Sequence, residues 1–280
     1  MRTAFRSAGI PNADLDARLL ASKLAGVEAH QLATEGDRPM PEPTQELLMR
    51  AMHDRLDGRP VHRILGERDF YGLTLSLSAA TLEPRPDTET LIDAVLPLAE
   101  GIVAAKGSCS IVDLGVGTGA IGLALVASCP GARCLGVDIS AEAVATALEN
   151  ARRLGLGDRY TAVTGDWLEG IDERFDLIVS NPPYIPTPDL VGLEREVREH
   201  DPLRALDGGA DGLDAYRIIA VQSVSRLENN GYVAVEIGID QTQPVKALFE
   251  TQGFESLGVF ADLGGVERVL TFKIGGNGGG

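Results

Sequence analysis

The sequence predicts an α/β fold in which a mostly parallel sheet is covered by helices on both faces. Beyond Ser108, short apolar runs alternate with segments of helical periodicity, which is the pattern of βαβ units. A glycine-rich turn follows the first apolar run, and a polar tetrapeptide follows the fourth. Both stretches come at the carboxyl ends of predicted strands, where open α/β sheets bind their ligands.

Residues 1–67 show helical periodicity, and we interpret them as a small helical domain. The first predicted helix has Asn12 and Asp14 as capping residues and Gly26 as its end. The residues that recur in it at helical spacing are Leu15, Leu19, Leu20 and Leu24. A second helix follows the proline-rich segment 39–43 and stops at Gly58. The residues expected on one face of it are Leu47, Leu48, Ala51, Met52 and Leu56.

Residues 68–83 are predicted to form a β-ribbon linker, because the period changes to alternation at Phe70, Leu73, Leu75 and Leu77. The next stretch, Pro84-Arg85-Pro86-Asp87, is a stiff loop that leads into a helix with Asp87 as its cap. Pro97 is predicted to kink or end that helix. Arg85 and Asp87 either belong to a simple linker or contact a ligand, and the sequence is compatible with both interpretations.

Residues 84–274 are predicted to form the sheet domain. The expected helices lie near 120–128, 141–154, 211–228 and 241–252, and the expected strands are Ser110–Leu114, Arg133–Ile139, Tyr160–Thr164, Phe175–Val179 and Tyr232–Ile237. A final pair, Glu255–Phe260 and Arg268–Lys273, has no helix between its strands, which indicates an antiparallel hairpin at the sheet edge. Residues 275–280 are nearly all glycine and are predicted to be a disordered tail.

The composition limits the partners and the compartment. A net charge of -16 without any Lys/Arg run disfavours direct nucleic-acid binding. Three cysteines without metal or disulfide spacing indicate core thiols in a reducing cytoplasm. No apolar stretch reaches the ~20 residues that a membrane span needs, and the four histidines lack metal-ligand spacing. We therefore expect a cytoplasmic protein without a membrane or metal association.

The tetrapeptide Asn181-Pro182-Pro183-Tyr184 follows the fourth predicted strand. Its prolines remove two N–H donors, so the carbonyls of Asn181 and Pro182 are left to accept hydrogen bonds from a ligand. Asn181 adds a side-chain acceptor, and Tyr184 adds a ring that can stack on a planar group. These features suit a planar NH2 group, as in a carboxamide or a nucleobase, although an Asn-Pro turn that merely ends the strand fits the tetrapeptide alone equally well.

A second candidate site is the glycine loop that follows the first predicted strand. Asp113 precedes Gly115, Val116, Gly117, Thr118 and Gly119, and the glycines allow a ligand to approach the backbone closely. Asp138 ends the next strand, where a carboxylate can bind ribose hydroxyls. A dinucleotide is one reading of this loop. Because Asp113 would repel a pyrophosphate but suit a positively charged amino acid moiety, we favour S-adenosylmethionine.

Asp166 and Trp167 follow the third predicted strand. The carboxylate offers an acceptor for an adenine amino group, and the indole offers a face for the ring. The alternative for Trp167 is a core aromatic.

Together these motifs resemble the Rossmann-like class I methyltransferases that use S-adenosylmethionine and act on amide or amino nitrogen. Within that group, the chain resembles the HemK/PrmC family of peptide chain release factor N5-glutamine methyltransferases through its helical N-terminal domain and through Gly66–Gly72, Pro84–Glu89, Val235–Gly238 and Glu267–Val269. The resemblance covers nearly the whole chain.

The resemblance implies that S-adenosylmethionine is the methyl donor and that no metal is required. It implies that the substrate is the glutamine of the Gly-Gly-Gln motif in bacterial class I release factors, which the helical domain would recognise. The residues that would bind substrate and carry the catalysis are Asn181, Pro182, Pro183 and Tyr184. The cofactor would be bound by Asp113, Gly115, Val116, Gly117, Thr118, Gly119, Asp138, Asp166, Trp167 and Asn181.

Three alternatives remain open from the sequence. A glutamine methyltransferase of a ribosomal protein would share the tetrapeptide. An adenine-N6 nucleic-acid methyltransferase uses a closely similar one, but it must hold phosphates and flip a base, which the acidic charge disfavours. A nucleotide-binding regulator without catalysis would need only the glycine loop and Asp138.

Overall fold

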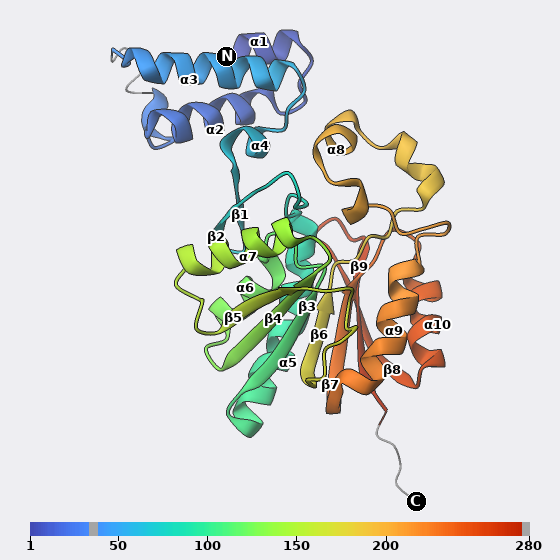
Figure 1. The fold of residues 1–280 in the computed structure, drawn as a ribbon. Coiled ribbons are helices and arrows are strands. Elements are labelled where there is room, and N and C mark those ends of the chain that lie inside the picture. The colour runs from blue at the N-terminus through green and yellow to red at the C-terminus, as the bar shows by residue number, and fades with distance from the viewer. Residues whose placement is uncertain (34–38, 276–280) are drawn as a thin grey trace, which may run out of the picture. The chain divides into compact units, whose positions relative to one another are not determined.

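The computed structural model describes residues 1–33 and 39–275. The chain forms two compact units (Figure 1). The first comprises Met1–Arg68 and Glu194–His200, and the second comprises Asp69–Leu193 and the chain from Asp201 onward. The segment 194–200 therefore belongs with the helical unit, although the sequence analysis assigned it to the sheet domain. Of the predicted disordered tail, 275–280, all residues after Gly275 lie outside the described residues.

Helices make up the first unit. They are α1 (Arg2–Ser7), α2 (Ala13–Ala25), α3 (Glu42–Leu56), α4 (Val61–Leu65) and α8 (Arg195–His200), with a 3₁₀ turn at Gln31–Ala33. The two helices predicted from the leucine pattern are present as α2 and α3, whereas α1, α4 and α8 were not predicted. Gly26 ends α2 in a left-handed conformation with φ 64°, as its position predicted.

Not all of the apolar residues that recur along α2 and α3 are buried. Leu15, Leu47 and Leu56 are exposed, whereas Asp16 and Arg55 are buried. The Arg55 Nε atom donates to Asp16 Oδ2 at 2.7 Å, and its Nη1 donates to Glu196 Oε1 on α8, also at 2.7 Å. The leucine periodicity could not reveal this face, because a buried ion pair occupies positions that apolar residues would normally take.

Two expected helix caps are also corrected. Asn12 holds the N-cap position of α2 but makes no capping hydrogen bond through its side chain. Asp87 does not cap α5 (Glu89–Lys106), because it lies in a 3₁₀ turn at Pro86–Thr88 and its carboxylate pairs with Arg268.

Pro97 does not end α5. The helix continues to Lys106, with Pro97 on its exposed side. The carbonyl of Asp93, which loses its helical partner to the proline, also belongs to an exposed residue, so water can satisfy it.

A seven-stranded sheet forms the centre of the second unit, and a separate two-stranded sheet of β1 (Glu67–Phe70) and β2 (Leu73–Ser76) precedes it. The large sheet has the order β5-β4-β3-β6-β7-β9-β8. Its strands are β3 (Cys109–Leu114), β4 (Ala132–Asp138), β5 (Tyr160–Thr164), β6 (Phe175–Ser180), β7 (Leu227–Glu236), β8 (Phe254–Ala261) and β9 (Glu267–Ile274). The first five are parallel, and β9 is antiparallel to both β7 and β8. The predicted parallel sheet with an antiparallel edge hairpin is confirmed.

Helices cover both faces of this sheet (Figure 1). One core contains residues of α5, α6 (Ala120–Ser128) and α7 (Ala141–Arg153), together with Ile111 of β3. The other contains residues of α9 (Asp214–Arg226) and α10 (Thr242–Thr251), together with the next strand residue, Val112. Because consecutive strand residues face opposite sides, a fully buried strand such as β6 serves both cores. All three cysteines are buried.

The sheet order brings the two candidate motifs together. The chain runs from β3 outward to β4 and β5, and it returns to the other side of β3 with β6. Leu114 pairs with Ser180 in the β3–β6 register. The glycine loop and the Asn181 tetrapeptide therefore start at adjacent strand ends, at the point where the strand order reverses.

Within residues 1–33 and 39–275, no helix combines the length and the apolar character that crossing a membrane requires.

Candidate active site

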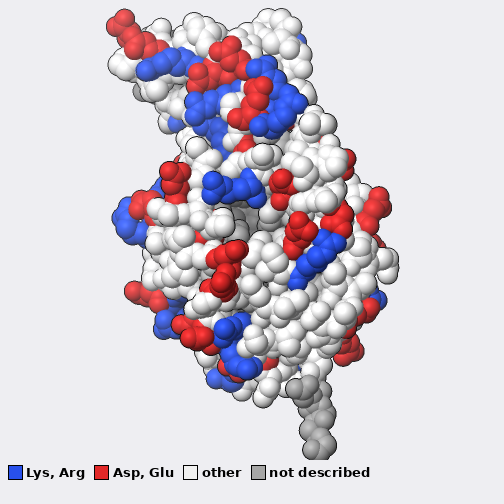
Figure 2. All heavy atoms as spheres, turned by 45° about the vertical axis from the view of Figure 1, so that its right-hand side comes forward, with Lys and Arg blue, Asp and Glu red and all other residues white. Residues whose placement is uncertain are grey.

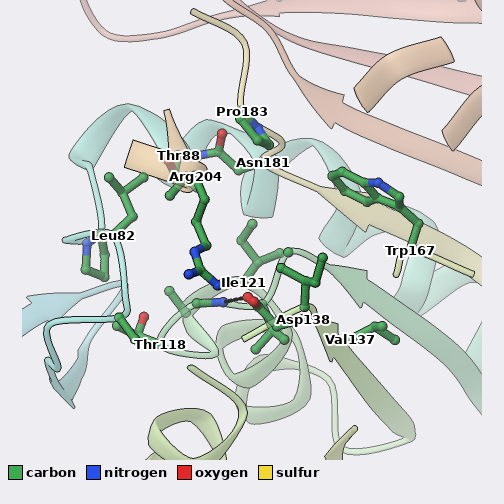
Figure 3. A pocket seen from close by; sticks show the side chains of 18 of the residues that line it. Leu82, Thr88, Thr118, Ile121, Val137, Asp138, Trp167, Asn181, Pro183 and Arg204 are labelled. Carbon is green, nitrogen blue, oxygen red and sulfur yellow. Dashed lines mark hydrogen bonds between the residues drawn. The ribbon is translucent and has the colours of Figure 1, made fainter. Parts of the chain in front are cut away.

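A cavity of about 300 Å³ opens at the carboxyl ends of the central strands (Figure 3). Its wall is formed by the loop before α5, the glycine loop, the end of β4, the segment after β5, and Asn181 and Pro183 after β6. All of these segments belong to the second unit. The cavity is therefore bordered by the segments at the ends of β3, β4, β5 and β6 and by the loop that precedes α5.

The glycine loop is held in shape by Asp138. Its Oδ2 accepts a hydrogen bond from the Gly117 amide at 3.0 Å (Figure 3), and its Oδ1 accepts one from the Ser140 amide at 2.8 Å. Gly115 and Gly117 have φ values of 73° and 53°, which favour glycine. Each carboxylate oxygen keeps a further lone pair, so Asp138 can also accept hydroxyl groups inside the cavity.

Asp113 is not among the residues that line the cavity. Its side chain is 1 % exposed, and its Oδ2 accepts a hydrogen bond from the Gly122 amide in α6 at 2.9 Å. Burial raises the pKa of Asp113 to about 7. Because Asp113 lies on the α6 side of β3, its hydrogen bond supports the turn into that helix, and its contact with a cofactor amino group stays a prediction.

Asp166 and Trp167 line the cavity. Trp167 has a positive φ of 53° and packs partly against the core on the α9 side of the sheet. Both predictions for Trp167 therefore have a basis, since the ring contributes to the core and also borders the cavity (Figure 3).

The side chain of Asn181 is fixed from one side. Its Nδ2 donates to Thr88 Oγ1 at 3.1 Å, and Figure 3 shows the two residues close together at one end of the cavity. With Nδ2 engaged, Oδ1 is the group that remains to accept a hydrogen bond from a ligand. Pro183 lines the cavity beside Asn181, whereas Pro182 is buried and Tyr184 lies outside the wall.

Tyr184 is held by the turn after β7. Its carbonyl accepts a hydrogen bond from Gln241 Nε2 at 2.9 Å, and Gln241 Oε1 accepts one from the Gly238 amide at 2.9 Å. A Cβ on Gly238 would lie 3.0 Å from Tyr184 Cδ2, so the glycine allows the ring to pack closely. Burial raises the pKa of Tyr184 to about 12, which keeps the hydroxyl neutral.

Glu236 is not one of the predicted site residues, although it lies in Val235–Gly238, one of the stretches that carry the family resemblance. It ends β7, is 2 % exposed, and stands next to the strand end that carries Asn181. Burial raises its pKa to about 7, although hydrogen bonds from Thr88 and Asn181 and the charge of Arg268 act in the opposite direction. A charged residue that ends an otherwise apolar strand was the signal that could have identified it.

The two charges of the Pro84–Asp87 loop are engaged by side chains of this chain. Arg85 Nη2 donates to Asp201 Oδ2 at 2.6 Å, and Asp87 pairs with Arg268 at 3.2 Å. Arg85 also lines the cavity, as does Arg204, a residue that no motif indicated. Figure 3 shows the Arg204 side chain extending into the cavity toward the Asp138 side.

Two family models match this chain. The PrmC N-terminal domain matches residues 1–66, and the Methyltransferase small domain matches residues 96–189. The second match includes the glycine loop, Asp138, Trp167 and Asn181.

Curated relatives match over nearly the full length. The chain is 47% identical to the release factor glutamine methyltransferase of Agrobacterium fabrum, over 97% of this chain and 94% of that protein. It is 46% identical to the release factor glutamine methyltransferase of Rhodospirillum rubrum, over 95% of this chain and 80% of that protein.

A solved structure supports the fold. The catalytic domain of hMettl16, in complex with the MAT2A 3'UTR hairpin 6, aligns with a TM-score of 0.58 at 17% identity, covering 84% of this chain and 83% of that one. The chain therefore shares its fold with that catalytic domain.

The cavity suits S-adenosylmethionine, the methyl donor of this enzyme class. Asp138 has acceptors for ribose hydroxyls, Trp167 provides an aromatic border, and the backbone of Gly115 to Gly119 allows close approach. No group of three or more His, Cys, Asp or Glu side chains in the described ranges could hold a metal ion. The fold, the cavity and the near full-length matches lead to one conclusion: the chain belongs to the family of release factor glutamine methyltransferases.

Proposed function

We propose that the protein methylates the side-chain amide nitrogen (N5) of the glutamine in the Gly-Gly-Gln motif of bacterial class I release factors. The observation that carries this proposal is the orientation of Asn181, whose Nδ2 is bound to Thr88 so that Oδ1 is left as an acceptor at the cavity wall. A carboxamide NH2 is a planar donor of two hydrogens, which matches such an acceptor.

The reaction requires positioning, because the lone pair of a carboxamide nitrogen is delocalised into its carbonyl. Asn181 Oδ1 and the Pro182 carbonyl would accept the two amide hydrogens, which shifts electron density onto the nitrogen and aims its lone pair. Such orientation is worth up to ~7–11 kcal/mol of the barrier. S-adenosylmethionine supplies the methyl group when bound. Tyr184 would hold the plane of the amide from the adjoining turn, and the methylated nitrogen then releases one proton to solvent.

The proposed cofactor contacts follow the cavity wall. Asp138 would accept the ribose hydroxyls, Asp166 the adenine amino group, and Trp167 would border the ring. Val116 and Thr118 contribute to the same wall as the glycines of the loop.

Charge supports a protein substrate over a nucleic acid. The chain carries a net charge of -16. On the face shown in Figure 2, acidic and basic side chains are interspersed rather than gathered into a basic field. Phosphate backbones require such a field. We infer that the enzyme acts in the cytoplasm, where release factors function, and that the helical unit contributes to their recognition.

A labelling experiment tests the proposal. The protein is incubated with labelled S-adenosylmethionine and either a purified bacterial release factor or the same factor with Gln→Ala in its Gly-Gly-Gln loop. We expect label only on the unmodified factor, and a peptide whose mass rises by one methyl group on that glutamine. Label that persists on the Ala version, or that appears only on a ribosomal protein or a nucleic acid added in parallel, would overturn the proposal.

A further inference from the structure

A buried carboxyl group, that of Glu236, lies beside Asn181 at the end of the neighbouring strand. In the parallel pairing of β6 and β7, Ser180 is the partner of Val235, so the next residues, Asn181 and Glu236, leave the sheet side by side. The Glu236 side chain is 2 % exposed, and its Oε2 has no hydrogen-bond partner within the described ranges of the chain. A buried, incompletely paired carboxyl costs stability, so its presence beside a catalytic amide calls for a functional reason.

The contacts of Glu236 converge on Asn181. The side-chain donors of Thr88 and Asn181 lower the pKa of Glu236 by favouring its ionised form. The only donor on the Asn181 side chain is Nδ2, and this atom also donates to Thr88 Oγ1 at 3.1 Å. The Thr88 hydroxyl could donate to Oδ1 as well, whereas an ionised Glu236 has no hydrogen to offer it, so of these two neighbours only Glu236 discriminates between Nδ2 and Oδ1.

We propose that ionised Glu236 is a positioning residue that fixes the amide of Asn181 with Oδ1, rather than Nδ2, toward the substrate. This inference rests on the proposed function, in which Oδ1 accepts a hydrogen from the substrate carboxamide. A carboxylate can only accept hydrogen bonds, so it rejects the flipped amide, which would turn Oδ1 toward it. In the flipped state Nδ2 would face the substrate NH2, and two donors would oppose each other.

Protonation of Glu236 removes the preference for one orientation of the Asn181 amide. A protonated carboxyl donates one hydrogen bond and can pair with Oδ1 of the flipped Asn181. The groups that face Glu236 are Arg268 from β9, Asp87 from the turn before α5, Tyr184 after β6 and Tyr216 from α9.

The balance of these groups sets the pH range over which Glu236 ionises. Burial raises the pKa of Glu236 to about 7, Asp87 acts in the same direction, and Arg268 opposes them. Burial keeps both tyrosine hydroxyls neutral by raising their pKa values. Because the ionised form is the active one, methyl transfer should fall as the pH decreases through about 7.

The kinetic test compares the full-length protein with Glu236→Gln. In the wild type we expect kcat to fall on the acid side of the raised pKa. The amide introduced by Glu236→Gln has both a donor and an acceptor, so it tolerates either orientation of Asn181. For this variant kcat should drop on the order of 10²-fold and lose the acid limb, while the KM for S-adenosylmethionine is unchanged. Thr88→Ser, which keeps the hydroxyl, should retain the limb, whereas Thr88→Val should lower kcat.

A substrate-free measurement keeps the inference separate from the proposed function. The side-chain NH2 signal of Asn181, identified by its disappearance in Asn181→Asp, is followed by NMR across the same pH range. In the wild type it should titrate with the pKa of Glu236, and in Glu236→Gln it should not. An Asn181 signal that does not respond to pH in the wild type, or a Glu236→Gln variant with wild-type kcat and an intact acid limb, would overturn the inference. Absence of glutamine methylation by the wild type, with the Asn181 titration present, would instead count against the proposed function alone.

Discussion

The hydroxyl of Ser180 donates a hydrogen bond to the carbonyl of Leu114 at 2.8 Å. Both residues are buried at the ends of adjacent parallel strands, and each immediately precedes one of the two functional motifs. This bond ties the start of the Asn181 tetrapeptide to the start of the glycine loop at Gly115. The sheet therefore holds the proposed cofactor-binding and substrate-binding parts of the site together, and mutation can test the proposed role of each.

Asn181→Ala should abolish methyl transfer without comparable loss of cofactor binding. The substitution removes Oδ1, the acceptor at the substrate side of the cavity, and leaves Asp138 and the glycine loop intact. We expect the dissociation constant for S-adenosylmethionine, measured by calorimetry, to change less than roughly tenfold, ~1.4 kcal/mol. If the variant no longer binds the cofactor at all, Asn181 is chiefly a cofactor residue.

Asp138→Ala should show the opposite pattern. The carboxylate accepts hydrogen bonds from the Gly117 and Ser140 amides, so its removal loosens the glycine loop and deletes the acceptor for ribose hydroxyls. Hydrogen bonds to charged groups contribute about 1.5–3 kcal/mol, so affinity should fall by about tenfold to a hundredfold. Saturating cofactor should restore much of the transfer rate. Unchanged affinity in the calorimetric titration that detects the wild-type complex would rule out this role.

The ion pair between Asp16 and Arg55 offers a test of the helical unit. Both side chains are buried, and Asp16→Ala would leave the Arg55 charge with Glu196 alone. Breaking a buried pair in this way costs about 3–5 kcal/mol of the free energy of unfolding. The measurement is denaturant unfolding followed by far-ultraviolet circular dichroism.

Asp14→Ala is the matched control for that experiment. Asp14 lies on the same helix and pairs with Arg6, but both side chains are more than half exposed. Its loss should therefore shift the unfolding midpoint little. Equal destabilisation by the two substitutions would show that the buried pair has no special importance.

Gly122 and Gly101, which both lie within helices, should respond oppositely to alanine. A Cβ on Gly122 would lie 2.7 Å from Cys134 Sγ and 2.9 Å from Tyr160 Cε2, whereas a Cβ on Gly101 has no neighbour within 4 Å. Gly122→Ala should destabilise the protein by about 1–3 kcal/mol through overpacking. Gly101→Ala should stabilise it by about 0.5–1 kcal/mol through the lower entropy of the unfolded chain. Thermal unfolding of both variants in one buffer measures the difference, and a stabilised Gly122→Ala would contradict the packing beside Asp113.

The strands of the central sheet could be located from the sequence because their information is local. The run Phe175–Val179 is buried at every position, as a strand covered on both faces must be, and the structure continues it by only one residue to Ser180. The glycine loop was equally readable, because Gly115 and Gly117 adopt φ values that other residues avoid. The sequence was less informative where polar residues are buried, as at Asp16 and Arg55, because periodicity reports apolar faces only.

By itself, the sequence determined which segments become strands, where the glycine loop lies, and that an acceptor-rich tetrapeptide follows a strand, since each of these depends on neighbouring residues. Only the tertiary structure decided which side chains meet. It turned Asp113 toward Gly122 in α6 and away from the cavity, and it joined Asn181 to Thr88 and Glu236, which are far apart along the chain. The physical reason is that strand register and helix docking fix the partners of a buried polar group, and no local pattern encodes them.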